Sequence, residues 1–354
     1  MRILISGICG FVGSTIALRL REISEGSEIF GCDNFIRPGS ELNRLRLRDA
    51  EIEVRHVDLR NTSDVDALAK ADWVIDAAAN PSVLAGVDDR TSSRQVVEHN
   101  LFGTVNLLEY CKRHRAGFIL LSTSRVYSIK ALNRIKLAVK DNAYQVAPNG
   151  SMPSGFSSAG VTEDFSTAPP LSLYGSTKLA SETLALEYGD LFDFPVWINR
   201  CGVMAGASQF GRADQGIFSF WVHSWAQRRP LKYIGFEGRG HQVRDCLHPR
   251  DLVSLLQKQI WTRSAAYRVS NFGGGVANSM SLAQLSAWCA KRFGPREIAS
   301  DPKARPFDLP WMVLDCARAA SEWGWQAETP IETVLEEIAT HAQSHPDWLE
   351  ISAP

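Results

Sequence analysis

The chain lacks a long apolar run, a strong charge of either sign and any closely spaced pair of cysteines. None of its hydrophobic segments approaches the roughly 18 residues at which a membrane-spanning helix is expected. Lys and Arg number 38 and Asp and Glu 39, a formal net charge of -1, which argues against a nucleic-acid or membrane partner. The 7 cysteines form no Cys-x-x-Cys pair, so we expect reduced thiols in a cytoplasmic protein, with no disulfide framework and no metal site.

The composition is that of an ordinary globular protein. The chain has 354 residues, 45% hydrophobic and 22% charged, enough for one large domain or two. Its N-terminus enters a strand directly, without a basic and apolar leader, so we expect no secretory signal.

A glycine loop near the N-terminus predicts a dinucleotide-binding unit. Arg2–Ser6 is an apolar run typical of a buried parallel strand, and a helical pattern starts at Ser14. Between them lie Gly7, Gly10 and Gly13. In such a loop the first glycine permits a tight turn, the second admits a pyrophosphate, and the third lets helix and strand pack closely. The pyrophosphate would lie on the helix N-terminus.

The residue after the second strand favours NAD over NADP. The strand Glu28–Cys32 ends at Asp33, where a carboxylate can bond the ribose 2′-hydroxyl and would repel a 2′-phosphate. Two alternatives stay open. Arg37 is close enough to weaken the preference, and Asp33 could simply cap a turn.

Three further strands lead into residues suited to a ligand crevice. They are Glu53–Val57 with Asp58 and Leu59, Trp73–Asp76 with Ala77, Ala78 and Ala79, and Phe118–Leu121 with Ser122, Thr123 and Ser124. Ligands of open α/β sheets lie beyond the carboxyl ends of the strands. A carboxylate can reach the adenine end of a cofactor, small residues leave room for a ligand, and a hydroxyl can bond a substrate hydroxyl. Tight packing is the alternative for the alanines, and an ordinary loop for the hydroxyl cluster.

A tyrosine and a lysine at helical spacing form the candidate catalytic pair. Tyr174 and Lys178 stand four positions apart, so on a helix both point to one face. A nearby ammonium lowers the pKa of a phenol from about 10, which would let it exchange protons near neutral pH. Taken alone, the pattern is more often a surface pair, and the motifs before it favour a site.

Together these motifs resemble the extended short-chain dehydrogenase/reductase superfamily, which includes nucleotide-sugar epimerases and dehydratases. The resemblance covers nearly the whole chain and implies an α/β fold: a Rossmann-like, doubly wound parallel sheet with a smaller C-terminal α/β substrate domain. It implies NAD as cofactor and Thr123, Tyr174 and Lys178 as the catalytic set. The cofactor-binding residues that it implies are Gly7, Gly10, Phe11, Val12, Gly13, Asp33, Asn34, Arg37, Asp58, Leu59, Ala77, Ala78, Ala79, Asn100, Ser122, Tyr174, Lys178 and Arg200.

Later segments resemble the CDP-paratose 2-epimerase branch, also called CDP-tyvelose epimerase. They are Arg200, Gly206, Gln209-Phe210, Asp214-Gln215-Gly216 and the run from Gln242 to His248. In such enzymes Arg244 would hold the diphosphate, for which a guanidinium fork is suited. The expected substrate-binding residues are Thr123, Ser124, Gln209, Gln215, Arg244 and Arg305, with plain solvation as the alternative for Arg305.

The expected domains are an NAD-binding unit over 1–200 and a nucleotide-sugar-binding unit over 201–354, with the helix at 245–260 packing back on the first. The first unit contains an insert, 129–170, that is either a lid or a solvated excursion. Ala131–Tyr144 in this insert is predicted to be helical. The resemblance also implies a homodimer or homotetramer, formed through helices near 96–113 and 178–188.

The resemblance implies epimerisation of a CDP-sugar at C2. Tyr174 would take a proton from a sugar hydroxyl while hydride passes to the nicotinamide, and hydride would return to the other face of the keto sugar. Thr123 would steady the oxygen and Lys178 would hold the nicotinamide ribose. A UDP-sugar 4-epimerase needs the same residues and stays open as an alternative. A 4,6-dehydratase would carry Asp-Glu where this chain has Ser124-Arg125, and a non-catalytic NAD-binding scaffold would not need all three catalytic groups.

Overall fold

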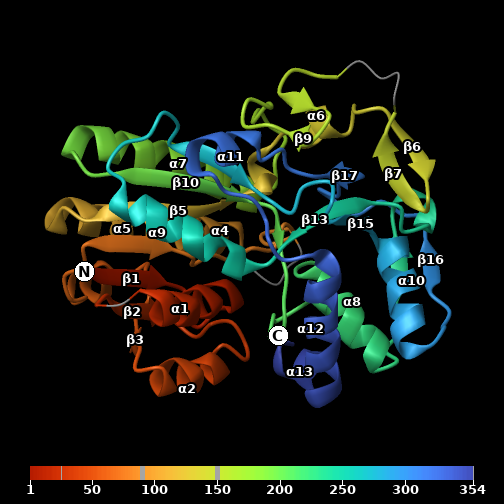
Figure 1. Ribbon diagram of the computed structural model, residues 1–354, viewed down its shortest axis with the longest axis horizontal. Helices are drawn as coiled ribbons and strands as arrows, with labels where there is room; N and C mark the ends of the chain where they lie inside the picture. Colours follow the sequence, from red (N-terminus) through yellow and green to blue (C-terminus); the bar gives the residue numbers. More distant parts are fainter. Residues whose placement is uncertain (25, 88–91, 148–151, 354) are drawn as a thin grey trace.

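The computed structural model describes residues 1–24, 26–87, 92–147 and 152–353, and its centre is a seven-stranded sheet flanked by helices (Figure 1). All neighbouring strands run parallel, in the order β14-β10-β5-β4-β1-β2-β3. The strands are β1 (Arg2–Ser6), β2 (Glu28–Asp33), β3 (Glu53–His56), β4 (Trp73–Asp76), β5 (Gly117–Thr123), β10 (Val196–Cys201) and β14 (Val269–Phe272). This arrangement confirms the predicted Rossmann-like, doubly wound sheet.

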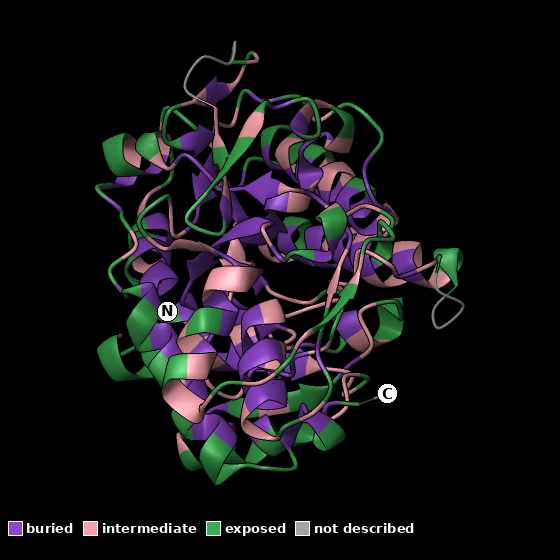
Figure 2. Ribbon diagram, turned by 90° about the vertical axis from the view of Figure 1, so that its right-hand side faces the viewer, coloured by how far each residue is buried: buried purple, intermediate pink, exposed green. Residues whose placement is uncertain are grey.

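The sheet is buried because helices cover both of its faces, as the purple interior in Figure 2 shows. In β1, Ile3 and Ile5 join one hydrophobic cluster and Leu4 joins the other, which explains the continuous apolar run. The helices on the first face are α1 (Phe11–Ile23), α2 (Glu41–Asp49), α9 (Val253–Trp261) and α11 (Ala317–Trp323). Those on the second are α3 (Thr62–Asp66), α5 (Gly103–His114) and α7 (Leu173–Phe192).

A second, smaller unit carries a four-stranded sheet and its own hydrophobic cluster. Its strands are β11 (Val203–Met204), β13 (Val243–Leu247), β15 (Ser279–Ser281) and β17 (Trp311–Met312), with a separate pair, β12 (Lys232–Ile234) and β16 (Ala299–Asp301). Its helices are α8 (Ile217–Ala226), α10 (Leu282–Phe293), α12 (Ile331–Ser344) and α13 (Trp348–Ile351). The chain crosses between the units more than once, because β14 joins the first sheet and α9 packs on α1. The division at residue 200 stays a prediction.

The segment 131–144 is not a helix, and this corrects the sequence prediction. After the single turn α6 (Ile129–Leu132), the chain forms an antiparallel hairpin of β6 (Leu137–Lys140) and β7 (Ala143–Val146). The two turn residues, Asp141 and Asn142, have φ values of 51° and 59°. Two consecutive left-handed residues match the right-handed twist of a hairpin, and Asp and Asn tolerate that conformation better than most residues do.

The hairpin lies against the second unit, beside β15 and α10 (Figure 1). The Tyr144 amide donates to the His241 carbonyl at 2.9 Å, and the Ser281 hydroxyl donates to the Asn142 carbonyl at 2.7 Å. The insert continues through β8 (Phe156–Ser157) and β9 (Gly160–Val161), and its residues 148–151 lie outside the described part of the chain. The hairpin is therefore attached to the start of α10.

In the described ranges, no helix has the length and apolar character needed to span a bilayer. Nor do those ranges contain a cluster of three or more His, Cys, Asp or Glu side chains arranged to hold a metal ion.

Candidate active site

A cavity of about 700 Å³ lies where the carboxyl ends of the sheet strands meet the second unit. All but three of the predicted site residues line it. Those on its wall are Gly7, Gly10, Phe11, Val12, Gly13, Asp33, Asn34, Arg37, Asp58, Leu59, Ala77, Ala78, Ala79, Ser122, Thr123, Ser124, Tyr174, Gln209, Gln215, Arg244 and Arg305. The three behind the wall are Asn100, Lys178 and Arg200.

The glycine loop leaves the first turn of α1 open toward the cavity. Gly7 has a φ of +61°, and a Cβ there would lie 2.8 Å from the Cα of Ala78. A Cβ at Gly13 would lie 2.3 Å from the Gly7 carbonyl oxygen. The N-cap residue of α1, Gly10, has no side chain to occupy the free amides of the first turn. Those amides and the helix dipole are suited to an anion such as a dinucleotide diphosphate.

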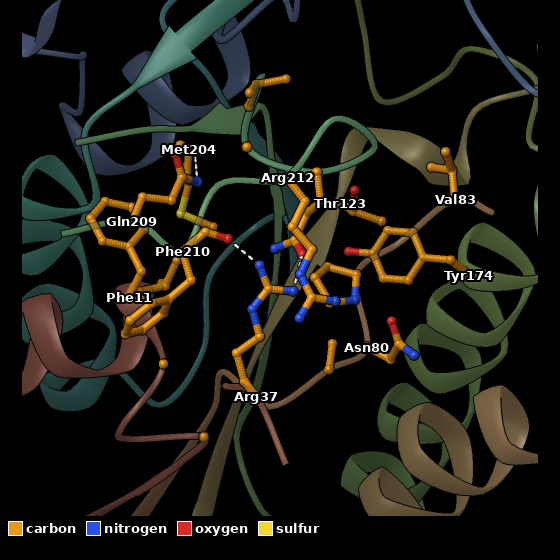
Figure 3. A pocket seen from close by; sticks show the side chains of 18 of the residues that line it. Phe11, Arg37, Asn80, Val83, Thr123, Tyr174, Met204, Gln209, Phe210 and Arg212 are labelled. Atoms are coloured by element: carbon orange, nitrogen blue, oxygen red, sulfur yellow. Dashed lines mark hydrogen bonds between the residues drawn. The ribbon is translucent and has the colours of Figure 1, made fainter. Parts of the chain in front are cut away.

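Asp33 lies at the end of β2 with its carboxylate held by backbone amides. It accepts hydrogen bonds from the amides of Cys9 at 2.9 Å and Phe35 at 2.8 Å. Burial raises the pKa of Asp33, and these amides oppose the rise. Arg37 turns away to the second unit, where it donates to the Gln215 side chain at 2.8 Å and to the Phe210 carbonyl (Figure 3). A ribose hydroxyl therefore suits this corner better than a phosphate.

Tyr174 and Thr123 meet inside the cavity (Figure 3). Tyr174 is the second residue of α7, a helix capped by Ser172, whose hydroxyl accepts from the Gly175 amide at 3.0 Å. Thr123 is the last residue of β5, and its side chain lies beside the phenol of Tyr174 (Figure 3). Tyr174 and Thr123 are buried, with 8% and 9% of their surface exposed. Burial raises the pKa of Tyr174 to about 12, and the Thr123 side chain and the Arg125 charge oppose that rise.

Lys178 is buried, with 1% of its surface exposed, one helical turn along α7 from Tyr174. Burial lowers the pKa of Lys178, and the charges of Asp76 and Glu182 oppose that shift. The net pKa shift at Tyr174 is upward because of burial. That Lys178 lowers the pKa of the phenol stays a prediction.

Asn100 and Arg200 lie behind the cavity wall, where their side chains make hydrogen bonds and an ion pair. Asn100 lies in a π-helical turn, η1 (Glu98–Phe102), between α4 (Ser93–Val97) and α5. Its carboxamide accepts from the Asn80 amide at 2.7 Å and donates to the Asn80 carbonyl at 3.1 Å. Arg200 forms a buried ion pair of 2.7 Å with Glu182, which also accepts from the Ser122 hydroxyl.

A group of arginines lines the cavity on the side of the second unit. Arg244 pairs with Asp308 at 2.9 Å, and Arg305 lies 3.8 Å from the same carboxylate. Arg125 lies close to this pair, and burial lowers its pKa to about 10. Two guanidiniums share one carboxylate here and a third lies close by, so the wall is suited to an anionic diphosphate.

Sequence reasoning missed three side chains on this wall. Asp308 follows the predicted Arg305 by three residues, but its pairing with Arg244 becomes visible only in the fold. Arg125 drew attention only as a departure from dehydratases. Gln242 stands two positions before Arg244, so alternation along β13 predicts that it shares the same face. It is 8% exposed, and its side-chain oxygen has no hydrogen-bond partner among the described residues.

A loop over 209–216 closes the cavity between the two units. Gln209 donates to the Met204 carbonyl at 2.8 Å, and Gln215 accepts from Arg37. The Ser82 hydroxyl donates to Asp214 at 2.5 Å, which ties the loop to the first unit. Gln209 and Gln215, both predicted to bind substrate, thus also make contacts within the protein.

Comparison with known proteins gives relatives among nucleotide-sugar epimerases and dehydratases. The CDP-paratose 2-epimerase of Salmonella typhi is 30% identical over 301 residues, which covers 80% of this chain and 82% of that protein. A UDP-glucuronate 4-epimerase of Thermodesulfobacterium geofontis is 24% identical over 343 residues, or 94% of this chain and 93% of that protein.

A solved structure supports the same relationship. The UDP-glucuronic acid 4-epimerase from Bacillus cereus, in complex with UDP-glucuronic acid and NAD, is similar with a TM-score of 0.78 and 25% identity. The similarity covers 97% of this chain and 99% of that one. Residues 3–265 also match the NAD dependent epimerase/dehydratase family, more than half of the chain. The chain therefore belongs to the NAD dependent epimerase/dehydratase family, which confirms the predictions of an enzyme of the nucleotide-sugar epimerase kind with NAD as its cofactor.

Proposed function

We propose that the protein is an NAD-dependent epimerase of a nucleotide-diphospho-sugar, of the CDP-paratose 2-epimerase type. One observation carries the proposal: three functional parts share a single cavity. The open glycine loop lies on one side, and Arg244 and Arg305 line the other. Tyr174 and Thr123 line the same cavity, side by side (Figure 3).

The residues of the first unit fit NAD. Side chains at Gly7 or Gly13 would fill the turn that a diphosphate needs, and both positions hold glycine. Asp33 offers a carboxylate to a ribose, and Ala77 and Ala78 leave the end of β4 open. When bound, NAD supplies the acceptor and later the donor of a hydride.

Tyr174 is the proton carrier in this proposal. It takes the proton of a sugar hydroxyl as the carbon that bears this hydroxyl loses its hydride, and it returns the proton when hydride comes back. Thr123 lies beside the phenol and opposes the rise of its pKa, which favours the phenolate. No net redox change follows, so the cofactor stays bound between turnovers.

Arg244 and Arg305 support a diphosphate ligand, and similarity favours a CDP-sugar. The two arginines, held by Asp308, present fixed donors at the cavity wall. Gln242, directly before β13 and two residues from Arg244, lines the same cavity. Its carboxamide is suited to a nucleobase edge. The 30% identity with a CDP-paratose 2-epimerase over 80% of the chain supports cytidine and C2.

A UDP-sugar 4-epimerase is the second candidate. The UDP-glucuronate 4-epimerase of T. geofontis matches a larger share of the chain, 94%, at 24% identity. A 4-epimerase requires the same catalytic residues as the proposed 2-epimerase. A dehydratase is disfavoured, because Ser124 and Arg125 offer no carboxylic acid beside Thr123.

Incubation with CDP-, UDP- and dTDP-sugars, followed by NMR of the configuration at C2 and C4, tests the proposal. Inversion at C2 of a CDP-sugar supports it. Inversion at C4 of a UDP-sugar supports the second candidate instead. Loss of water to a 4-keto-6-deoxy sugar, or no turnover of any of the three classes, contradicts the proposal.

We further propose a cytoplasmic homodimer or homotetramer that associates through the helices around 96–113 and 178–188. Phe102 has 53% of its surface exposed at the junction of η1 and α5, which supports an apolar contact there. The free cysteines agree with a reducing compartment. Light scattering on the protein and on Phe102→Glu tests the assembly: a monomer before substitution contradicts it.

A further inference from the structure

We propose that Trp348 is a positioning residue for NAD: it fixes the start of the loop 209–216, which lines the cavity, and so slows the release of the cofactor. Gln209, Phe210 and Arg212 of this loop line the cavity, and Trp348 packs behind them on α13. The inference rests on NAD as the cofactor of the family and does not depend on which sugar is turned over.

Trp348 holds the start of the loop by a hydrogen bond and a ring stack. Its indole Nε1 donates to the Gln209 carbonyl at 2.9 Å. Its ring stacks on that of Phe210, with centroids 5.1 Å apart and planes 15° from parallel. Trp348 is only 5% exposed, so water competes little for the indole donor. The side chain of Trp348 therefore fixes both the backbone at residue 209 and the ring at residue 210.

The chain that follows α13 continues this attachment. The Arg212 Nε donates to the Ser352 carbonyl at 2.9 Å. The buried Ser352 hydroxyl donates to the Gly211 carbonyl at 3.4 Å. Each of the four loop residues 209–212 thus contacts the segment 348–352.

The same part of the loop is joined to the first unit. Arg37 donates to the Phe210 carbonyl (Figure 3) and to the Gln215 side chain at 2.8 Å. Gly39 has a φ of +88°, and a Cβ there would lie 2.8 Å from the Phe210 ring and 3.0 Å from the Ile351 side chain. Glycine at position 39 therefore lets the two units and α13 pack together at one junction.

This junction lies beside the corner in which Asp33 is expected to bind the ribose. Arg37 follows Asp33 by four residues and lines the same cavity. Phe210 and Phe11, the first residue of α1, line it as well. A dinucleotide with its ribose at Asp33 and its diphosphate on the first turn of α1 would therefore lie next to the junction. We expect NAD to leave when the contact between Arg37 and Phe210 opens, and α13 keeps that contact closed.

The first test is the rate at which bound NAD leaves the protein. Radiolabelled NAD is released into an excess of unlabelled NAD, from the unsubstituted chain and from Trp348→Leu. Leucine removes both the indole donor and the ring stack, so the release rate should rise by about tenfold or more. Trp348→Phe keeps an aromatic ring and removes the donor, so its release rate should rise by only about threefold.

Trp225→Leu is the matched control. Trp225 is 3% exposed in the second unit, and its indole also donates to a backbone carbonyl, that of Gly294 at 3.1 Å. Its release rate should equal that of the unsubstituted chain. An unchanged rate in a folded Trp348→Leu overturns the inference, as does an equal rise in Trp225→Leu. If circular dichroism shows that Trp348→Leu does not fold, Trp348→Phe decides in its place, and an unchanged rate there overturns the inference.

The second test observes the loop itself and needs no ligand. The Gly211 amide donates to the Gln209 carbonyl at 2.8 Å, and the Arg212 amide donates to the Gln215 carbonyl at 2.7 Å. Deuterium uptake by a peptide that spans 209–216 should be about tenfold faster in Trp348→Leu and unchanged in Trp225→Leu. Equal uptake in Trp348→Leu and the unsubstituted chain overturns the inference. If no nucleotide sugar is turned over, the proposed function fails, while the release rate and the uptake still decide the role of Trp348.

Discussion

Replacing Gly13 by alanine should weaken NAD binding strongly. The added Cβ would lie 2.3 Å from the Gly7 carbonyl oxygen and 2.8 Å from the Cα of Ile8. Both neighbours are backbone atoms, so no side chain can rotate to relieve the contact. Ordinary contact begins at 3.4 Å, so the first turn of α1 must move by about 1 Å.

The expected loss of NAD affinity follows from that displacement of the first turn. Overpacking of this kind costs about 1–3 kcal/mol. If this free energy is lost from the NAD-bound state, the Kd for NAD rises about 10- to 100-fold, at about 1.4 kcal/mol for each factor of ten. Gly10→Ala is the control for stability, because its Cβ would approach only the Gly7 oxygen, at 3.1 Å. It should cost less unfolding free energy than Gly13→Ala, although its Cβ lies where the pyrophosphate is expected.

Calorimetric titration of NAD into the three proteins provides the measurement, with urea unfolding to report stability. A folded Gly13→Ala protein that binds NAD as tightly as the unsubstituted chain would refute the reasoning. So would a larger loss of unfolding free energy in Gly10→Ala than in Gly13→Ala.

Three other predictions follow from buried charges. Glu182→Gln leaves Arg200 buried without its carboxylate and should cost about 3–5 kcal/mol of unfolding free energy, measured in urea; a loss below about 1 kcal/mol would contradict the pairing. Asp33→Asn removes the carboxylate that would repel a 2′-phosphate, so it should raise the affinity for NADP relative to NAD by about tenfold. An unchanged ratio of the two Kd values would contradict a contact between Asp33 and the ribose. Burial lowers the pKa of His341 to about 4 and that of His223 to about 3, so both are neutral when folded. Stability should therefore be full above the unfolded pKa of about 6.5 and fall from there toward pH 4, with a smaller fall in His223→Gln.

Features that depend on residues adjacent in the sequence were predictable from the sequence. The glycine loop, Asp33 and the strand ends are local patterns in which each residue fits one known backbone geometry, and the structure brings them to one cavity. The parallel sheet followed from continuous apolar runs, which require cover on both faces.

What could not be predicted depends on distant contacts or on two turn residues. The segment from Ala131 to Tyr144 was predicted to be helical, but the left-handed pair Asp141 and Asn142 fixes a hairpin instead. The upward direction of the pKa shift at Tyr174 depends on burial, which only the fold determines. The cluster of Arg125 and Arg244 with Asp308 joins three separate segments, so spacing alone carried no sign of it.

The central claim is that the phenol of Tyr174 moves the proton while an NAD-dependent hydride transfer inverts a sugar carbon. The most direct measurement is the turnover of Tyr174→Phe on the substrate identified by NMR, beside its Kd for NAD. The account predicts a fall in kcat of about 100- to 10,000-fold with an unchanged Kd. Turnover at the rate of the unsubstituted enzyme would contradict it.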